Sequence, residues 1–190
     1  MINDVERVLF SEERIRAGVD ALAESVANAY RGREFTVVSV LKGSCVFASD
    51  LIRRLPIPLE LSFVVASSYR ERTTAGEIDL RYFPSPEELA GRSVLLVDDI
   101  LDTGRTLHFL SEKIMASGAN DVATCVLFDK PVRRQVEIEA DFKCFEIDDS
   151  FIVGYGLDFA GRYRNLPFVG ELKPSVYAGT EPFEGTVAKS

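Results

Sequence analysis

VLLVDDILDTGRTL, at residues 94–107, carries the strongest local pattern in the chain. Its apolar opening predicts a buried strand at 93–99, of the kind found in parallel sheets. From Gly104 onward the apolar residues take helical spacing, which predicts a helix at 104–117 with one apolar side formed by Leu107, Leu110, Ile114 and Met115. Acids and threonines crowd the junction between the two elements. The stretch therefore predicts a strand–loop–helix unit whose loop carries polar chemistry.

The same alternation of strands and helices extends on both sides of this unit. Further helices are expected at 11–30 and 44–55, and further strands at 35–41, 59–66 and 121–129. This order predicts an α/β fold with a parallel twisted sheet flanked by helices on both faces. In such sheets ligands bind beyond the carboxyl ends of the strands. The loops after 35–41 and 93–99 should therefore meet at one site.

The remaining segments carry weaker patterns. Short strands are expected at 142–147 and 150–156, whereas residues 67–89 are polar and nearly free of apolar periodicity. Long stretches of that kind are usually mobile or functional. We predict a single domain over residues 1–177 and a loose tail at 178–190.

Composition narrows the classes of function. A chain of 190 residues with 46% hydrophobic residues is sufficient for one well-buried domain. The net charge of −8 argues against a nucleic-acid partner bound through a basic surface. No apolar run is long enough to span a bilayer, so no membrane partner is expected. The three cysteines, which are Cys45, Cys125 and Cys144, are far apart and are expected to be free, buried thiols in a cytoplasmic protein.

The loop after strand 93–99 permits two interpretations. Thr103, Gly104, Arg105 and Thr106 would open a helix, so that free backbone N–H groups and hydroxyls form a phosphate cradle. Alternatively, Asp102 or Thr103 simply caps the helix. From the four cradle residues alone the cap is favoured, because short motifs match by chance.

Asp98 and Asp99 add a second chemistry to this loop. Adjacent carboxylates at the end of an apolar strand are costly unless they are hydrated, hydrogen-bonded or paired with a cation. Hard oxygen ligands beside a phosphate site suit Mg²⁺. The alternative is that both acids face solvent and cap the loop.

The stretch 94–107 resembles the phosphoribosyl-pyrophosphate-binding signature of type I phosphoribosyltransferases. Further matches narrow the resemblance to the hypoxanthine-guanine phosphoribosyltransferase family. They are VLKGS (40–44) with its pyrophosphate loop, SSY (67–69) with its mobile loop, and FDK (128–130) and SFIVGYGLDFAGRYRNLPFVG (150–170) with its purine-binding segment and hood. The matches run from about Val8 to Gly170 in the family's order and spacing.

The resemblance implies transfer of the 5-phosphoribosyl group from phosphoribosyl pyrophosphate to N9 of a 6-oxopurine. Hypoxanthine and guanine would give IMP and GMP, with release of pyrophosphate, in Mg²⁺-dependent purine salvage. The family's fold has a small hood, which here would come from the N-terminal region and about 142–177. Family members are homodimers or homotetramers, and the same is expected here.

The resemblance also assigns roles to the residues of the central loop. Asp102 matches the acid near purine N7 and is the expected catalytic residue. Asp98 and Asp99 match the acidic pair at the ribose hydroxyls beside the metal. Asp98 stands where the family often has Glu, and its side chain is one methylene shorter. Its contact with ribose could therefore be either direct or mediated by water. The 5-phosphate cradle is matched by Thr103, Gly104, Arg105 and Thr106.

Other matched residues surround the pyrophosphate. Lys42 and Gly43 match the loop that touches pyrophosphate, in which the family often has a cis peptide bond. Arg164 matches a second pyrophosphate contact. Asp158 matches a further metal-associated carboxylate at the purine side, so that Asp98, Asp99 and Asp158 are the expected metal residues.

The purine-binding matches complete the implied site. Lys130 matches the lysine that donates to the 6-oxo group, which would disfavour adenine because its amino group is itself a donor. Phe151 matches the aromatic that stacks on the base, and Ile152 a residue with backbone contacts to the purine edge. Ser68 and Tyr69 match the tip of the mobile loop, which would close over the site and exclude water.

Two rival functions remain open at this point. The first is the same transfer to xanthine or to a pyrimidine. A pyrimidine lacks the N7 that Asp102 would serve, and xanthine needs an additional contact near Ile152 and Asp158. The second rival is a non-catalytic regulatory module that binds phosphoribosyl pyrophosphate and RNA or protein. The net charge of −8 argues against the RNA-binding form, and Asp102 together with Lys130 favours catalysis.

Overall fold

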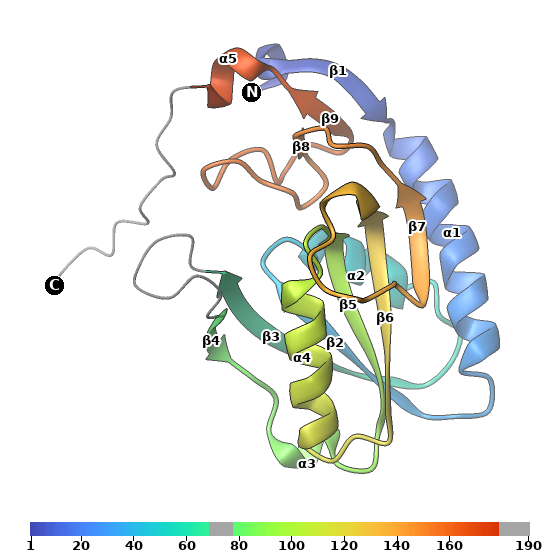
Figure 1. Cartoon of the computed structure of the whole chain (residues 1–190). Helices are drawn as coiled ribbons and strands as arrows, with labels where there is room; N and C mark the ends of the chain where they lie inside the picture. The colour runs from blue at the N-terminus through green and yellow to red at the C-terminus, as the bar shows by residue number, and fades with distance from the viewer. Residues whose placement is uncertain (69–77, 179–190) are drawn as a thin grey trace, which may run out of the picture.

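A six-stranded sheet forms the centre of the protein (Figure 1). The structure, a computed structural model, describes residues 1–68 and 78–178. The strand order is β4-β3-β2-β5-β6-β7, with bounds Ile78–Tyr82, Leu59–Ser68, Phe35–Leu41, Ser93–Leu101, Asp121–Asp129 and Phe142–Glu146. All neighbouring strands are parallel except β3 and β4, which are antiparallel. The predicted parallel α/β fold is confirmed.

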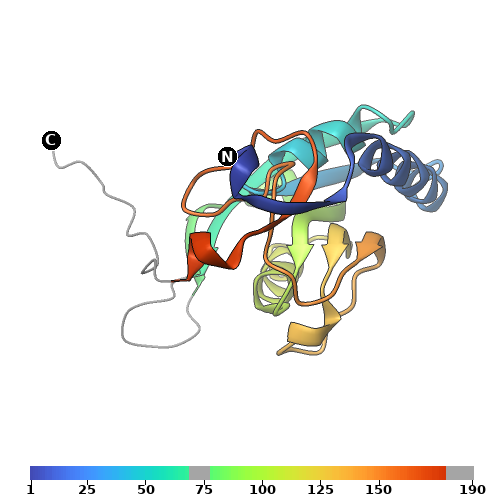
Figure 2. The same cartoon turned by 90° about the horizontal axis from the view of Figure 1, so that it is seen from above.

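Helices cover both faces of this sheet (Figures 1 and 2). On one face, α1 (Glu12–Ala29) and α2 (Cys45–Ile52) pack against Leu95 and Val97 of β5. On the other face, α4 (Arg105–Ala116) packs against Val94 and Leu96 of the same strand. Because β5 is buried on both faces, it reads as a continuous apolar run. No helix of the described chain has the length and apolar character needed to cross a bilayer.

The long helix α1 forms as its sequence predicts. Ser11 is the N-cap, and its hydroxyl accepts a hydrogen bond from the Arg14 backbone N–H at 3.3 Å. The predicted apolar stripe is buried, namely Ile15, Val19, Leu22 and Val26. The chain leaves the helix through Gly32, whose φ of +74° suits glycine. Two other helix predictions need correction, because α2 ends at Ile52 rather than at residue 55 and Met115 of α4 is 46% exposed.

A second, three-stranded antiparallel sheet lies beyond the carboxyl ends of the main strands (Figure 1). Its order is β1 (Val5–Phe10), β9 (Val169–Leu172) and β8 (Ile152–Val153). The strand predicted at 150–156 is wrong beyond Val153. Gly154, Tyr155 and Gly156 have φ values of +104°, +50° and +100°, so the backbone cannot remain extended. The loop 154–168 begins here and returns to β9.

The polar segment 67–89 contains more structure than its composition indicates. Residues 78–89 form β4 and the short helix α3 (Pro86–Leu89). Glu88 accepts a hydrogen bond from the Ser85 backbone N–H at 2.9 Å and completes a capping box at the start of α3. Leu89 is fully buried. The two short 3₁₀ helices η1 (Ile2–Asp4) and η2 (Pro131–Arg133), with α5 (Pro174–Tyr177), complete the elements described.

The three cysteines are free thiols, as predicted, but they are not all buried. Cys125 of β6 is buried and Cys144 of β7 is partly buried, whereas Cys45 at the start of α2 is exposed. The expectation of burial is therefore wrong for Cys45. The predicted tail at 178–190 lies, except for Ala178, outside the described residues.

Truncation of Leu110 and of Met115 separates the two sides of α4. Leu110 is 0% exposed and Met115 is 46% exposed. We expect Leu110→Ala to lower the free energy of unfolding by about 2–5 kcal/mol, because it leaves a cavity in the core. Met115→Ala should change it by less than about 0.5 kcal/mol. Urea unfolding followed by circular dichroism measures both, and equal losses would contradict the packing of α4.

Candidate active site

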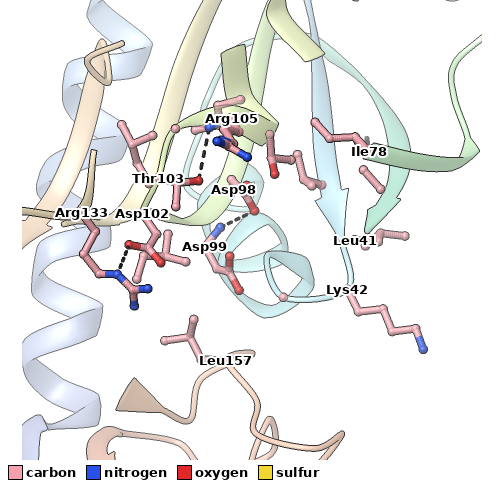
Figure 3. Close-up of a pocket in the computed structure, with 18 of the residues that line it drawn as sticks. Leu41, Lys42, Ile78, Asp98, Asp99, Asp102, Thr103, Arg105, Arg133 and Leu157 are labelled. Carbon is pink, nitrogen blue, oxygen red and sulfur yellow. Dashed lines mark hydrogen bonds and ion pairs between the residues drawn. The ribbon is translucent and has the colours of Figure 1, made fainter. Parts of the chain in front are cut away.

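One cavity of about 730 Å³ opens at the carboxyl edge of the main sheet (Figure 3). It lies between the ends of β2 and β5, the start of α4 and the loop 154–168. The cavity collects every residue expected to contact phosphoribosyl pyrophosphate. Lining it are Lys42, Gly43, Asp98, Asp99, Asp102, Thr103, Gly104, Arg105, Thr106, Asp158 and Arg164.

The turn from β5 into α4 leaves its N–H groups available to a ligand. Gly104 is the N-cap residue, with φ of +84°, and as a glycine it has no side chain that could cap the helix. A Cβ atom at residue 104 would lie 2.6 Å from Ile138 Cγ2, so the turn is also packed tightly from outside. Thr103 Oγ1 accepts only a long hydrogen bond, 3.5 Å, from the Arg105 N–H. The first-turn N–H groups have no partners within the helix, which suits an anion better than the capping interpretation.

Asp98 and Asp99 follow the apolar run of β5, and neither has an ion-pair partner among the described residues. Asp98 is 8% exposed, and its Oδ1 accepts the Asp99 backbone N–H at 2.9 Å. Within residues 1–68 and 78–178, no ion pair joins either carboxylate to a basic side chain. Burial raises the pKa of both carboxyl groups, and for Asp98 the charge of Asp99 raises it further. Two crowded carboxylates of this kind are a suitable donor set for a hard cation.

The loop after β2 lies directly against this acidic pair. The Leu41–Lys42 peptide bond is cis, as the family resemblance led us to expect. A Cβ atom at residue 43 would lie 1.7 Å from Asp99 Oδ2, so only glycine permits this approach. Lys42 is exposed, and its side chain points away from Asp98 and Asp99 in Figure 3.

Asp158 and Arg164 form an ion pair within the loop 154–168. Arg164 Nη2 lies 2.6 Å from Asp158 Oδ1, and Arg164 Nη1 donates to the Gly156 carbonyl at 2.6 Å. Asp158 Oδ2 accepts the Gly161 N–H at 2.8 Å. In the described chain, no group of three or more acidic, histidine or cysteine residues is placed to hold a metal. Asp158 therefore lines the same cavity as the acidic pair of β5 without forming such a group with it.

Of the residues expected at the purine, Asp158 lines the cavity, whereas Lys130, Phe151 and Ile152 are not among its lining. Lys130 is 4% exposed; its Nζ donates to the Ser150 carbonyl at 3.0 Å and lies 2.7 Å from Asp149 Oδ1. Phe151 is 36% exposed and stacks on Tyr177 with ring centroids 4.9 Å apart. Ile152 is buried in the core on the α1 face of the sheet, so its side chain is committed to packing.

The predicted mobile-loop residues cannot be compared with the structure. Tyr69 lies outside the described residues, and Ser68 is described only as the last backbone position of β3. Their roles stay predictions.

The segment after Lys130 holds the central loop in place, which the sequence reasoning missed. Arg134 Nη1 donates to the carbonyls of Leu101 and Asp102 at 3.0 and 2.6 Å. The Gln135 N–H donates to the Thr103 carbonyl at 2.9 Å, and Arg133 Nε lies 3.6 Å from Asp102 Oδ1. The only signal in the sequence is the run of polar residues at 133–135, directly after a lysine already assigned to the site.

Comparisons with known proteins agree with this geometry. Residues 8–160 match the family described as the phosphoribosyl transferase domain. The hypoxanthine-guanine phosphoribosyltransferase of Streptococcus agalactiae is 42% identical over 177 residues, which are 93% of this chain and 98% of that protein. The bifunctional protein TilS/HprT of Listeria monocytogenes is also 42% identical, over 94% of this chain, but the chain spans only 28% of that protein.

A solved structure extends the similarity to the whole architecture. The crystal structure of a hypoxanthine phosphoribosyltransferase from Staphylococcus aureus superposes with a TM-score of 0.87 at 39% identity. The match covers 93% of this chain and 96% of that one. By sequence and by fold, the chain belongs to the hypoxanthine-guanine phosphoribosyltransferase family.

Proposed function

We propose that the protein transfers the 5-phosphoribosyl group of phosphoribosyl pyrophosphate to N9 of hypoxanthine or guanine. The products are IMP or GMP and pyrophosphate, and the role is purine salvage in the cytoplasm. The observation that carries the proposal is one cavity in which Asp98 and Asp99, which have no ion-pair partner among the described residues, lie beside a helix start whose N-cap residue is Gly104. A simple phosphate site has no use for two adjacent acids, of which Asp98 is buried and Asp99 is partly buried. A sugar phosphate that develops positive charge during the reaction uses both the phosphate-binding helix start and the two acids.

The phosphate groups of the substrate fit the two ends of the cavity. Thr103, Gly104, Arg105 and Thr106 hold the 5-phosphate with backbone N–H groups and hydroxyls. Lys42, Gly43 and Arg164 contact the pyrophosphate. Arg164 is bound to Asp158 in this structure, so it would exchange that partner for pyrophosphate when the substrate binds.

The reacting carbon lies between these ends in the proposed complex. As the bond from ribose C1′ to pyrophosphate lengthens, C1′ gains oxocarbenium character, and the negative charge of Asp98 and Asp99 stabilises it. These two carboxylates also fit Mg²⁺, with Asp158 as a further carboxylate once Arg164 turns away. When bound, Mg²⁺ neutralises charge on the leaving pyrophosphate.

The purine is recognised along one edge in this proposal. Lys130 donates a hydrogen bond to the 6-oxo group, and Asp102 accepts the proton from N7 as N9 attacks. Phe151 stacks on the base, Ile152 contributes backbone contacts to its edge, and Ser68 and Tyr69 close over the site. We further propose that the protein acts as a homodimer or homotetramer.

An assay with five bases tests the proposed function. Hypoxanthine, guanine, xanthine, adenine and uracil are each supplied with phosphoribosyl pyrophosphate and Mg²⁺, and nucleotide formation is followed by absorbance. Hypoxanthine and guanine should be used, with adenine at least about 100-fold lower in kcat/KM because its amino group opposes the donor Lys130. Turnover of xanthine alone would reassign the base, and turnover of none would end the enzyme proposal.

Replacement of Asp102 by Asn tests the proton-accepting role. Asn keeps the size of the side chain but cannot accept the N7 proton, so kcat should fall about 10²- to 10⁴-fold. The KM for phosphoribosyl pyrophosphate should stay within about threefold, because ground-state binding does not use that proton transfer. Glu24→Gln, on the exposed side of α1, is the control. Equal losses in kcat and in substrate binding would contradict the role.

Metal removal tests the acidic pair, with binding as a readout that does not depend on turnover. Phosphoribosyl pyrophosphate should raise the Tm of the wild-type protein more in Mg²⁺ than in EDTA, because a ligand that binds the native state stabilises that state. In Asp99→Asn this Mg²⁺-dependent part of the shift should largely disappear. The same Tm shift in EDTA and in Mg²⁺ would show that the carboxylates do not bind the metal.

A further inference from the structure

We propose that Arg133 is a positioning residue for the transfer reaction and that it acts through the Asp102 carboxylate. The inference rests on the proposed function, because it concerns how the proton-accepting group is held. Arg133 is the last residue of η2, which follows β6, and it lines the same cavity as Asp102. In Figure 3 a dashed line joins Nε of Arg133 to the Asp102 carboxylate.

The Asp102 carboxylate depends on Arg133 for its orientation. Asp102 Oδ1 is buried and accepts no hydrogen bond within the described residues. Arg133 Nε lies 3.6 Å from that oxygen, and it is the basic group that the described chain places within ion-pair distance of it. A buried carboxylate oxygen without a donor is costly. The attraction of Arg133 therefore favours the rotamer in which Oδ1 faces η2 and Oδ2 remains available to the substrate.

The backbone of the same loop is held independently of Arg133. Arg134 donates to the carbonyl groups of Leu101 and Asp102. Arg134 is in turn ion-paired with Asp129, which is 5% exposed at the end of β6. The two successive arginines thus have different roles. Arg134 holds the backbone at Leu101 and Asp102, and Arg133 holds the Asp102 carboxylate. Loss of the Arg133 guanidinium should free the Asp102 side chain while the loop stays in place.

Arg133 also connects the two groups proposed to read the purine. Its Nη1 lies 3.9 Å from Asp149 Oδ1, the atom that is 2.7 Å from Lys130 Nζ. In a 6-oxopurine, N7 and O6 lie on the same edge of the base. Asp102 at N7 and Lys130 at O6 must therefore be spaced to fit one edge. The Arg133 guanidinium group contacts the Asp102 carboxylate and the Asp149 carboxylate that is paired with Lys130, and so it aligns the acceptor with the donor.

This role leaves the chemistry of the step unchanged. The N9–C1′ bond forms as the C1′–oxygen bond to pyrophosphate breaks, and its electron pair leaves with pyrophosphate. The N7 proton passes to Asp102. Arg133 neither gives nor takes a proton, because guanidinium stays charged throughout. Its contribution is the fraction of time that Oδ2 of Asp102 points at N7.

A double-mutant cycle tests whether Arg133 acts through Asp102. The full chain is prepared as wild type, Arg133→Gln, Asp102→Asn and the double variant, and kcat and KM are measured with hypoxanthine. Arg133→Gln should lower kcat about tenfold in the wild-type background, with the KM for phosphoribosyl pyrophosphate within about twofold. In the Asp102→Asn background it should lower kcat by less than about twofold, because the group it positions no longer accepts a proton.

Two further variants control the cycle. Arg16→Gln removes the same charge from the exposed side of α1 and should leave kcat unchanged. Arg133→Lys keeps a cation but loses the planar fork, so its kcat should fall between those of wild type and Arg133→Gln. It also serves for the cycle if Arg133→Gln lowers the Tm enough to compromise folding.

The outcomes separate this inference from the proposed function. The same fold loss in both backgrounds, or an unchanged kcat in Arg133→Gln, would overturn the positioning role while wild-type turnover upholds the enzyme. A wild-type protein that uses no oxopurine would overturn the function itself, and the role of Arg133 in the reaction with it.

Discussion

The parallel pairing of β5 with both β2 and β6 is the constraint on which the site depends. It ends three strands at the same edge, so that the loops after them converge without any direct sequence link. Because β5 is buried on both faces, it also carries Asp98 into a desolvated position at that edge. Burial at the end of this strand disfavours the charged form of the two carboxyl groups, and a cationic ligand would offset that cost.

The small sheet anchors the loop 154–168, whose residues Leu157, Asp158 and Arg164 line the cavity. Its strands come from both ends of the described chain, as β1 pairs with β9. The loop 154–168 between β8 and β9 carries the ion pair of Asp158 with Arg164 and faces the loop after β2. Asp158 is paired with Arg164 inside this loop, whereas the described residues place no basic side chain within ion-pair distance of Asp98 or Asp99.

Much of this arrangement could be predicted from local patterns, and the misses have physical reasons. The β5–α4 unit was predictable because burial on two faces leaves an unbroken apolar run. β1 has three exposed side chains among its six, and only Phe10 is buried, so it shows no apolar alternation. The extended course predicted beyond Val153 failed where positive φ values turn the chain. Arg133 was missed because a charged residue in a loop acquires meaning only from the carboxylate beside it.

Gly43 has a consequence for how the site is built. On one side a Cβ atom there would lie 1.7 Å from an Asp99 carboxylate oxygen, and on the other side a Cβ atom at Gly156 would lie 2.2 Å from the Gly43 carbonyl. The backbone of Gly43 alone therefore separates Asp99, at the end of β5, from Gly156, in the loop 154–168. Any side chain added at residue 43 would displace the loop 154–168 or the Asp99 carboxylate. The separation between the Asp99 carboxylate and Gly156 is thus set by the thickness of the Gly43 backbone itself.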